Sequence, residues 1–210
     1  MSFRRYRLLP SKTVVNTMAR PREFDPNDVL QTAIELFWEK GYAASSVDEV
    51  VRRSGVAKYG VYGTFGSKRE MFKKVLAQYG LDRRRDMHRP IRTPNAALPE
   101  VKRFFERAVE LMTPKGDRRG CLMVNTGLEL GARDGEIADL VNDFFSELNG
   151  VMEGCLSRAA QLGQLDATED ISALATYLTT EFRTALMLSG SGCSREQIQA
   201  HLDFALRVLH

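Results

Sequence analysis

The sequence is poor in the residues that form disulfides and metal sites. Its 210 residues include only three cysteines and three histidines. Cys121, Cys155 and Cys193 are odd in number and far apart, which argues against a disulfide framework and fits a reducing compartment. The histidines and cysteines do not have the spacing of metal ligands. The chain also contains no HExxH, GxSxG or phosphate-loop motif. We therefore expect no metal, no cofactor and no enzymatic activity.

Long apolar runs are missing too. No stretch reaches the roughly 18 apolar residues of a membrane-spanning helix, and the start of the chain lacks the apolar segment and cleavage site of a secretory signal. We expect a cytoplasmic protein that does not enter a membrane. Both Met1 and Met18 are compatible with translation starts, because residues 1–17 show no pattern that could build a core.

Proline is scarce, but its distribution is informative. Three of the seven prolines fall between Arg89 and Pro99, where no helical periodicity exists. Because proline removes a backbone donor and restricts its neighbours, this segment is interpreted as a linker. We divide the chain into a basic flexible arm (1–23), a first domain (24–84) and a larger second domain (85–210).

Strand-like alternation is absent, and every strong periodicity is helical. Hydrophobic residues make up 43% of the chain, enough to bury a core. Asp25 and Pro26 cap a first helix that ends at Gly41. Further helices are expected at about Val47–Arg53, Ala57–Thr64, Ser67–Met87, Val101–Met112, Cys121–Leu130, Asp134–Gly163, Ile171–Leu188 and Arg195–Leu209. The fold class is all-α, with about nine helices.

The net charge of +3 conceals an asymmetry. Residues 1–88 hold 17 Lys and Arg and 10 Asp and Glu, a charge of +7, whereas residues 89–210 hold 13 and 17, a charge of −4. A basic front half suits the binding of a polyanion, since neutralised phosphates release their counterions. Uneven surface charge without a ligand explains the asymmetry equally well.

The stretch Ser46–Lys68 predicts two short helices joined by a tight turn. Ser46 and Glu49 form the S-x-x-E pattern of a helix start, and Ser67 with Glu70 repeats it. Gly55 supplies the turn between the two helices. Two short helices around a glycine, flanked by basic residues, are typical of a DNA-binding helix-turn-helix at about 47–66.

These residues carry a family resemblance. The stretch LQTAIELFWEKGYAASSVDEVVRRSGVAKYGVYGTFGSKREMF resembles the DNA-binding domain of TetR/AcrR transcriptional regulators over about residues 24–84. The landmarks are Ala33, Leu36, Phe37, Gly41, Tyr42, Ser46, Val47, Gly55, Val56, Ala57, Lys58, Tyr62, Phe65, Ser67 and Lys68. The second domain matches only in length and helical architecture. The resemblance implies a three-helix DNA-binding domain followed by a helical domain for effector binding and dimerisation.

The resemblance also assigns residues to double-stranded DNA. Lys58 suits a guanine edge or a phosphate, and Lys68 suits a phosphate beside a helix start. The full set of expected DNA contacts is Arg20, Arg22, Ser46, Lys58, Tyr59, Gly60, Tyr62, Gly63, Thr64 and Lys68. Tyr59, Gly60, Gly63 and Thr64 depart from residues common in the family, so base preferences cannot be carried over.

The expected function is a ligand-released repressor that binds a palindromic operator as a homodimer. The small-molecule effector is expected near Phe104, Phe105, Met112, Cys121, Asn125, Glu129, Phe144, Phe145 and Tyr177, although each also suits the core. Cys121, at a helix start after Arg118 and Arg119, has the setting of a low-pKa thiol, and an inert buried cysteine is the alternative. The expected dimer interface comprises Leu174, Leu178, Phe182, Ile198, Leu202, Ala205 and Leu209. A helical architectural or adaptor protein that binds DNA without sequence preference is the alternative.

Overall fold

The computed structural model describes residues 24–112, 119–166, 168 and 170–209, and this part of the chain contains helices and no strand. The α-helices are α1 (Pro26–Lys40), α2 (Val47–Ser54), α3 (Lys58–Phe65), α4 (Lys68–Asp86), α5 (Leu98–Met112), α6 (Leu122–Leu130), α7 (Gly135–Gln161), α8 (Ile171–Gly190) and α9 (Arg195–Ala205). Short 3-10 helices follow α4, as η1 (Pro90–Arg92), and α9, as η2 (Leu206–Leu209). The prediction of an all-α fold with about nine helices is confirmed.

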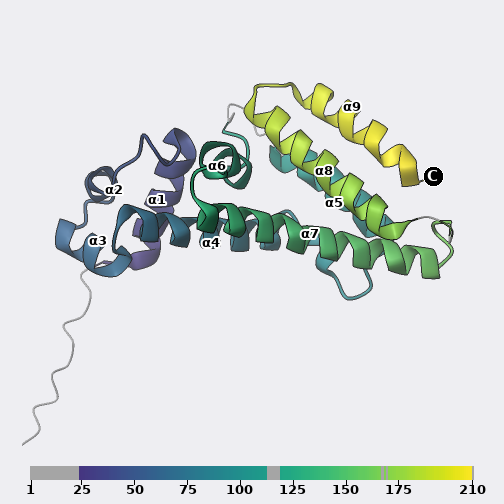
Figure 1. Ribbon diagram of the computed structural model, residues 1–210, viewed down its shortest axis with the longest axis horizontal. Helices are drawn as coiled ribbons and strands as arrows, with labels where there is room; N and C mark the ends of the chain where they lie inside the picture. Colours follow the sequence, from purple (N-terminus) through teal and green to yellow (C-terminus); the bar gives the residue numbers. More distant parts are fainter. Residues whose placement is uncertain (1–23, 113–118, 167, 169, 210) are drawn as a thin grey trace, which may run out of the picture.

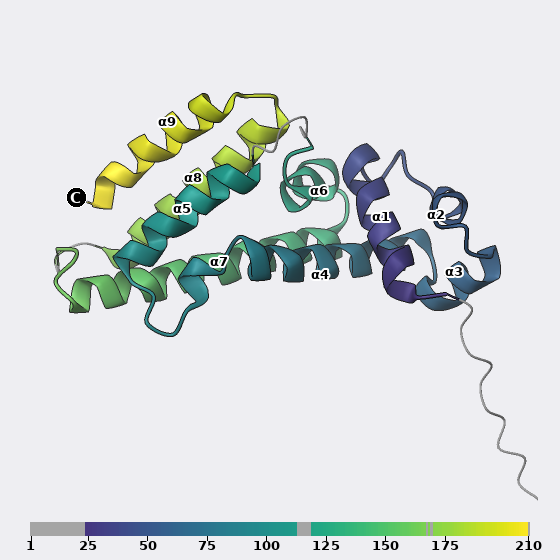
Figure 2. The same ribbon diagram turned by 180° about the vertical axis from the view of Figure 1, so that it is seen from behind.

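The helices form a small unit at one end and a larger bundle at the other (Figure 1). Helices α1, α2 and α3 make the small unit, and α4 runs from it into the bundle of α5, α7, α8 and α9. Helix α6 lies between the two ends in both views (Figure 2). No described helix is long and apolar enough to cross a membrane.

The helix starts read from the sequence are all present. Asp25 accepts a hydrogen bond from the Asn27 amide at 2.8 Å, and Pro26 occupies the first helical position of α1. Ser67 with Glu70, and Ser194 with Gln197, form complete capping boxes on α4 and α9. Each cap satisfies backbone N–H groups that lack a partner inside their own helix, which is why these positions set the element boundaries.

The proline-rich segment Arg89–Pro99 is not the free linker that its composition suggested. Ile91, Ala96 and Ala97 are buried, and the Cys155 Sγ–H donates to the Ile91 carbonyl at 3.3 Å. Pro99 falls in the first turn of α5, where its missing N–H leaves no bond unmade. The segment is therefore a packed connection, and the domain boundary near residue 84 stays a prediction because α4 continues through it.

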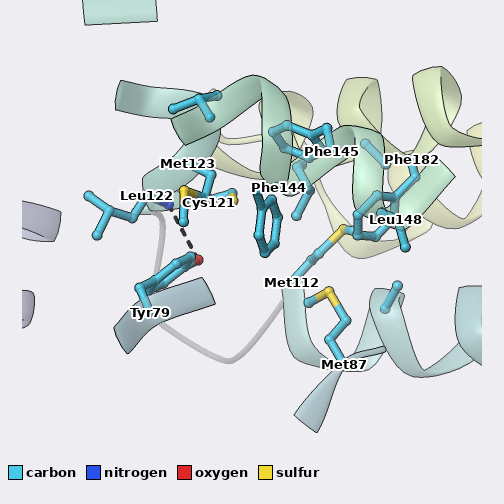
Figure 3. Packing of buried hydrophobic residues seen from close by; sticks show 14 of the residues in the cluster. Tyr79, Met87, Met112, Cys121, Leu122, Met123, Phe144, Phe145, Leu148 and Phe182 are labelled. Carbon is cyan, nitrogen blue, oxygen red and sulfur yellow. Dashed lines mark hydrogen bonds between the residues drawn. The ribbon is translucent and has the colours of Figure 1, made fainter. Parts of the chain in front are cut away.

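Gly80 lies in the middle of α4, where glycine weakens a helix. A Cβ at this position would lie 3.3 Å from Met123 Cε and 3.4 Å from Phe144 Cδ2. Figure 3 shows the hydroxyl of Tyr79, the neighbouring residue on α4, accepting from the Leu122 amide of α6 at 3.3 Å. Glycine at position 80 lowers the helix propensity of α4. Its missing side chain lets α4 approach α6 and α7 closely.

His88 is buried in an aromatic part of the bundle. Its ring lies 5.6 to 6.3 Å, between centroids, from the rings of Phe104, Phe144 and Phe182, and Nδ1 has no hydrogen-bond partner among the described residues. Burial, with a smaller contribution from the positive charge of Arg92, lowers the pKa of His88 to about 3. The folded protein therefore holds this imidazole neutral.

We expect His88 to make stability fall in mild acid. Its pKa rises from about 3 in the folded chain to an ordinary value of 6.5 on unfolding, so below pH 6.5 protonation favours the unfolded state. The contribution is complete above pH 6.5, and at pH 5 about 2 kcal/mol of it is lost. Urea unfolding at pH 7 and pH 5 should show a larger loss for the wild type than for His88→Leu, and equal losses would contradict this origin.

Candidate nucleic-acid interface

Helices α2 and α3 form a helix-turn-helix held by a small apolar core. The Ser46 hydroxyl accepts from the Glu49 amide at 3.1 Å, which starts α2. Gly55 adopts a left-handed conformation with φ of 69°, as a tight turn between two helices requires. Val61 and Phe65 turn inward from α3 and are buried. This anchoring leaves the opposite side of α3 exposed.

The outward side of α3 carries several of the residues expected to contact DNA. Tyr59 is 75% exposed and Tyr62 is 39% exposed. Lys58 is exposed as well, and nothing lies within 4 Å of a Cβ built on Gly63, so a partner could approach the backbone there. The structure thus brings Lys58, Tyr59, Tyr62 and Gly63 to one surface, and their contact with DNA stays a prediction.

Gly60 and Thr64 are placed differently from expectation. A Cβ on Gly60 would lie 2.8 Å from Phe24 Cε1, so this glycine faces the start of α1 and not the open side of α3. Thr64 is half-buried, and its carbonyl accepts from Lys74 Nζ at 2.8 Å. Gly60 therefore has a packing role that sequence reasoning missed. Its contact with DNA stays a prediction.

Asp48 is an acidic residue on the same surface. Lys58 Nζ lies 2.8 Å from Asp48 Oδ1, and the Tyr62 hydroxyl lies 3.5 Å from the same oxygen. A hydrogen bond to Asp48 raises the pKa of Lys58, so this lysine stays charged. The pairing orients Lys58 and also reduces its availability to a phosphate.

Lys68 lies at the start of α4, next to the turn between α1 and α2. Its Nζ donates to the Ala43 carbonyl at 3.3 Å and lies 4.4 Å from the centre of the Tyr42 ring. No carboxylate of the described residues forms an ion pair with it. Lys68 therefore combines a free positive charge with a fixed position beside a helix N-terminus, as its predicted phosphate contact requires.

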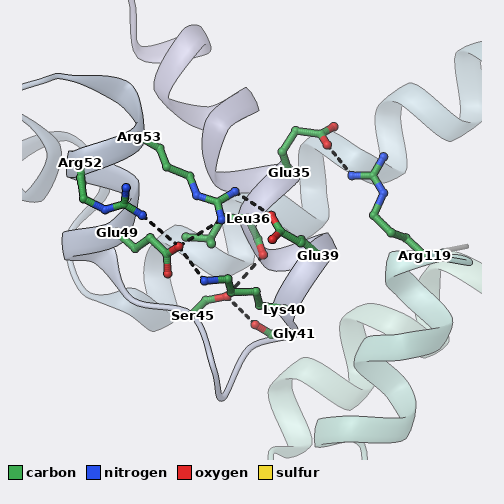
Figure 4. A network of polar contacts seen from close by, with 10 residues as sticks. All are labelled: Glu35, Leu36, Glu39, Lys40, Gly41, Ser45, Glu49, Arg52, Arg53 and Arg119. Atoms are coloured by element: carbon green, nitrogen blue, oxygen red, sulfur yellow. Dashed lines mark hydrogen bonds and ion pairs between the residues drawn. The ribbon is translucent and has the colours of Figure 1, made fainter. Parts of the chain in front are cut away.

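An ion-pair network holds α2 against α1 (Figure 4). Glu49 accepts from Lys40 at 2.7 Å and from Arg53 at 3.1 Å, and Arg53 also reaches Glu39 at 2.7 Å. These pairs engage the positive charges of Lys40 and Arg53. Residues 24–88 hold 11 Lys and Arg and 9 Asp and Glu, a net charge of only +2. Most of the basic excess of the front half therefore falls on residues 1–23.

Arg20 and Arg22, predicted to reach DNA from the basic arm, lie outside the described residues. The arm itself, residues 1–23, does so as well.

Glu129 of α6, expected in the effector pocket, instead joins the two parts of the fold. Its carboxylate accepts from the backbone amides of Tyr42 at 2.8 Å and Ala43 at 2.7 Å, in the turn after α1. Adding a Cβ to Gly41 would place it 2.8 Å from Glu129 Oε2, so glycine allows this approach. The expected pocket role of Glu129 is therefore wrong, because its oxygens are occupied by the chain itself.

Further polar contacts join the same two parts. Arg69 of α4 contacts Asp134 through two hydrogen bonds, of 3.0 and 2.9 Å, and Glu136 at 2.6 Å. The Trp38 indole N–H donates to the Gly120 carbonyl at 3.1 Å, and the Arg119 guanidinium lies 4.1 Å from the centre of the Trp38 ring.

Most of the other expected pocket residues form the core. Phe104, Phe105, Phe144 and Phe145 are at most 4% exposed, and the rings pack in the pairs Phe104–Phe105 and Phe144–Phe145. Tyr177 points outward on α8, and the Asn125 amide donates to the Arg119 carbonyl at 2.7 Å. Two of the nine border described cavities: Met112 lines a space of about 30 Å³ near Trp38 and Arg83, and Phe105 lines one of about 270 Å³ between α5 and α9. The assignment of the remaining residues to an effector pocket stays a prediction, because periodicity does not distinguish a core side chain from a lining one.

Cys121 lies at the start of α6 as expected, but its surroundings do not favour a thiolate. The side chain is 3% exposed, and burial raises the pKa of the Cys121 thiol despite its place at a helix start. Desolvation of the thiolate outweighs the helix N-terminus. No group of three potential metal ligands occurs among the described residues.

The stripes predicted to form a dimer interface are buried within one chain. Leu178, Ile198 and Leu202 have no exposed surface, and the remaining predicted residues are at most 8% exposed: Leu174, Phe182, Ala205 and Leu209. They hold α8 and α9 to each other and to the bundle. The prediction is wrong for these residues because the apolar stripe of each helix faces its neighbours in the same chain.

Comparison with known proteins supports the geometry. The family described as bacterial regulatory proteins, tetR family, matches residues 29–75, and a tetracyclin repressor-like C-terminal domain matches residues 97–203. The chain belongs to the TetR family. It is a DNA-binding transcriptional regulator, as predicted, and not an enzyme.

Individual relatives match this TetR-family chain over 70% of its length or more. It is 28% identical to the uncharacterized HTH-type transcriptional regulator YezE of Bacillus subtilis, over 91% of this chain and 100% of that protein. It is 32% identical to the transcriptional regulator AcuR of Cereibacter sphaeroides, over 70% of this chain and 68% of that protein. Among solved structures, the regulator CifR in complex with a 26-bp operator is 26% identical and has a TM-score of 0.80. The match covers 90% of this chain and 98% of CifR.

Replacing Lys68 with alanine should weaken binding to all DNA sequences alike. A lysine that contacts a phosphate contributes about 0.9 to the slope of log affinity against log salt, so the slope should fall by about one. Fluorescence anisotropy across a salt series measures it, with Lys102→Ala on α5 as the matched control. An unchanged slope for Lys68→Ala would remove Lys68 from the phosphate contacts.

Replacing Glu129 with alanine should destabilise the fold by about 1–3 kcal/mol, because it leaves the partly buried Tyr42 amide without an acceptor, whereas water can replace the acceptor of the exposed Ala43 amide. Glu129→Gln retains an acceptor and should lose less. Urea unfolding provides the measurement. Glu136→Ala, which breaks only exposed ion pairs with Arg69 and Lys73, should cost no more than about 1 kcal/mol. Equal losses for the two alanine variants would contradict the bridging role of Glu129.

Proposed function

We propose that this TetR-family regulator is a repressor that binds a palindromic operator as a homodimer and is released by a small-molecule effector. The main support is the outward side of α3, where Lys58, Tyr59, Tyr62 and Gly63 share an exposed surface. Side chains of this kind on the second helix of a helix-turn-helix suit base edges and phosphates in a major groove.

The relatives favour repression over activation. The repressor ComR of Escherichia coli is 25% identical over 94% of this chain and 95% of that protein. The activator FasR of Mycolicibacterium smegmatis matches only 28% of this chain. A match that includes the second domain is the more informative one for how DNA binding is controlled. The bacterial chromosome lies in the cytoplasm, and a regulator of this kind would act there.

An electrophoretic shift assay on the DNA upstream of the protein's own gene tests this proposal. A repressor should give a saturable complex that survives excess competitor DNA, protects a symmetric site in a footprint, and lowers transcription from that promoter. Binding that competitor DNA abolishes would instead support the architectural reading.

The homodimer needs a surface other than the buried stripes. Helices α8, α9 and η2 expose Tyr177, Phe204 and Val208, and Phe204 is 65% exposed. These apolar side chains lie on the outer side of the two helices, since the inner side is filled by the core. A second copy that packs there would form a four-helix seam and hold two copies of α3 at a fixed spacing.

Phe204→Glu should convert the dimer to a monomer, because a carboxylate would be buried at the apolar seam. Light scattering after gel filtration measures the mass, and operator affinity should fall at least about tenfold, a change of roughly 1.4 kcal/mol. Leu162→Glu, at an apolar residue 60% exposed after α7, is the matched control and should stay dimeric. A dimeric Phe204→Glu would place the seam elsewhere.

A further inference from the structure

The largest hollow described in the second domain is a groove of about 390 Å³ between α6, α7 and α8. A volume of this size falls in the range of small-molecule sites. The groove is bordered by Val124, Gly127, Leu128, Gly131, Ala138, Val141, Asn142, Thr180, Arg183, Thr184 and Met187. None of these residues was predicted from the sequence to contact an effector.

The charged group at the groove is Arg183. Its guanidinium lies 4.3 Å from the centre of the Phe145 ring, so stacking holds the side chain in place. No carboxylate of the described residues forms an ion pair with Arg183. The residues around the groove include no Asp or Glu, which leaves its single positive charge unbalanced.

The hydroxyls in the groove do not offer a donor to a ligand. Thr180 donates to the Thr176 carbonyl at 2.8 Å, and Thr184 donates to the Thr180 carbonyl at 3.1 Å. The N–H donors that remain belong to Arg183 and Asn142. Hydrogen-bond acceptors on a ligand would find the donors of Arg183 and Asn142 at this end of the groove, and a negative charge there would pair with Arg183.

The rest of the groove is apolar and exposed. Leu128 of α6 is 73% exposed and Met187 of α8 is 46% exposed, with Val124 and Val141 completing the walls. Large apolar side chains left open beside a cavity indicate a surface that a ligand or partner covers.

We propose that this groove binds a small monocarboxylate with an apolar body, whose carboxylate pairs with Arg183 while its body covers Leu128 and Met187. The inference rests on the proposed function, because it names the chemical class of the effector.

The position of the groove connects it to the DNA-binding end. Leu128, on the groove wall, is followed by Glu129, whose carboxylate holds the amides of Tyr42 and Ala43. A ligand inserted between α6 and α8 would shift α6, and with it the contact that fixes the turn before α2. Occupancy and operator affinity are thereby coupled through one short helix.

Calorimetry on the full chain tests the site. The probes are hexanoate, decanoate and phenylacetate, with hexan-1-ol and hexylamine as neutral and cationic controls. At least one carboxylate should bind and release the operator, and Arg183→Met should weaken its binding at least about tenfold, as expected for a lost charge-assisted hydrogen bond. Arg183→Lys should retain part of the affinity. Arg158→Met, which removes an exposed charge elsewhere on α7, should bind as the wild type does.

A second variant separates the groove from Arg183 alone. Ala138→Phe places a ring in the groove from a half-buried position on α7 and should abolish carboxylate binding while operator binding persists. The inference is overturned if no carboxylate binds, if binding survives both substitutions, or if Ala138→Phe makes the protein monomeric, since the groove would then belong to the dimer seam. Operator binding in the absence of ligand tests the proposed function separately. If the protein binds its operator but no carboxylate, the proposed function stands and only this inference is overturned.

Discussion

Two backbone amides in the turn after α1 find their hydrogen-bond acceptor in a different part of the fold. Glu129 of α6 accepts from the amides of Tyr42 and Ala43, and the carbonyl of Ala43 accepts from Lys68 at the start of α4. The N–H of Ala43 is thus bound by Glu129 of the second domain. Its C=O is bound by Lys68, the residue expected to contact phosphate. A partly buried amide without an acceptor costs more than a surface contact gains, so this turn has one favoured position relative to α6. The helix-turn-helix begins three residues later, at Ser46, and takes its orientation from that turn.

The neighbouring ion pairs have a different role. Arg69 with Asp134 and Glu136, and Lys73 with Glu136, connect α4 to the start of α7. These side chains are partly solvent-exposed, and exposed pairs contribute little to stability, typically about 0–1 kcal/mol each. They favour one alignment of α4 and α7 without locking it. The stronger constraint on α4 is its close approach at Gly80, so a shift of α6 or α7 cannot leave α4 unaffected.

The sequence predicted the elements well and their surroundings poorly, for physical reasons. Caps such as Asp25, Ser46, Ser67 and Ser194 act within four residues, so local pattern was enough to find them. Periodicity identified the apolar stripes of α8 and α9 but could not show whether the same chain or a second copy covers them. The suggestion of a low-pKa thiol at Cys121 has a similar weakness. The sequence shows the helix start, but it does not show the burial that raises the pKa of this thiol. The groove was missed because its residues are small, polar or isolated along three helices, and only the packing of those helices brings them together.

Affinity and base recognition are carried by different parts of the chain. Helix α3 is eight residues long, has no side-chain cap and contains two glycines, so its own contribution to a rigid reading surface is small. Lys58, the one lysine of α3, forms an ion pair with Asp48. Residues 24–88 together carry a net charge of only +2. Phosphate binding strong enough to hold such a helix in a groove must come from charge outside α3. Lys68 and a second copy of the domain are two sources, and the third is residues 1–22, with six positive charges and no acidic residue.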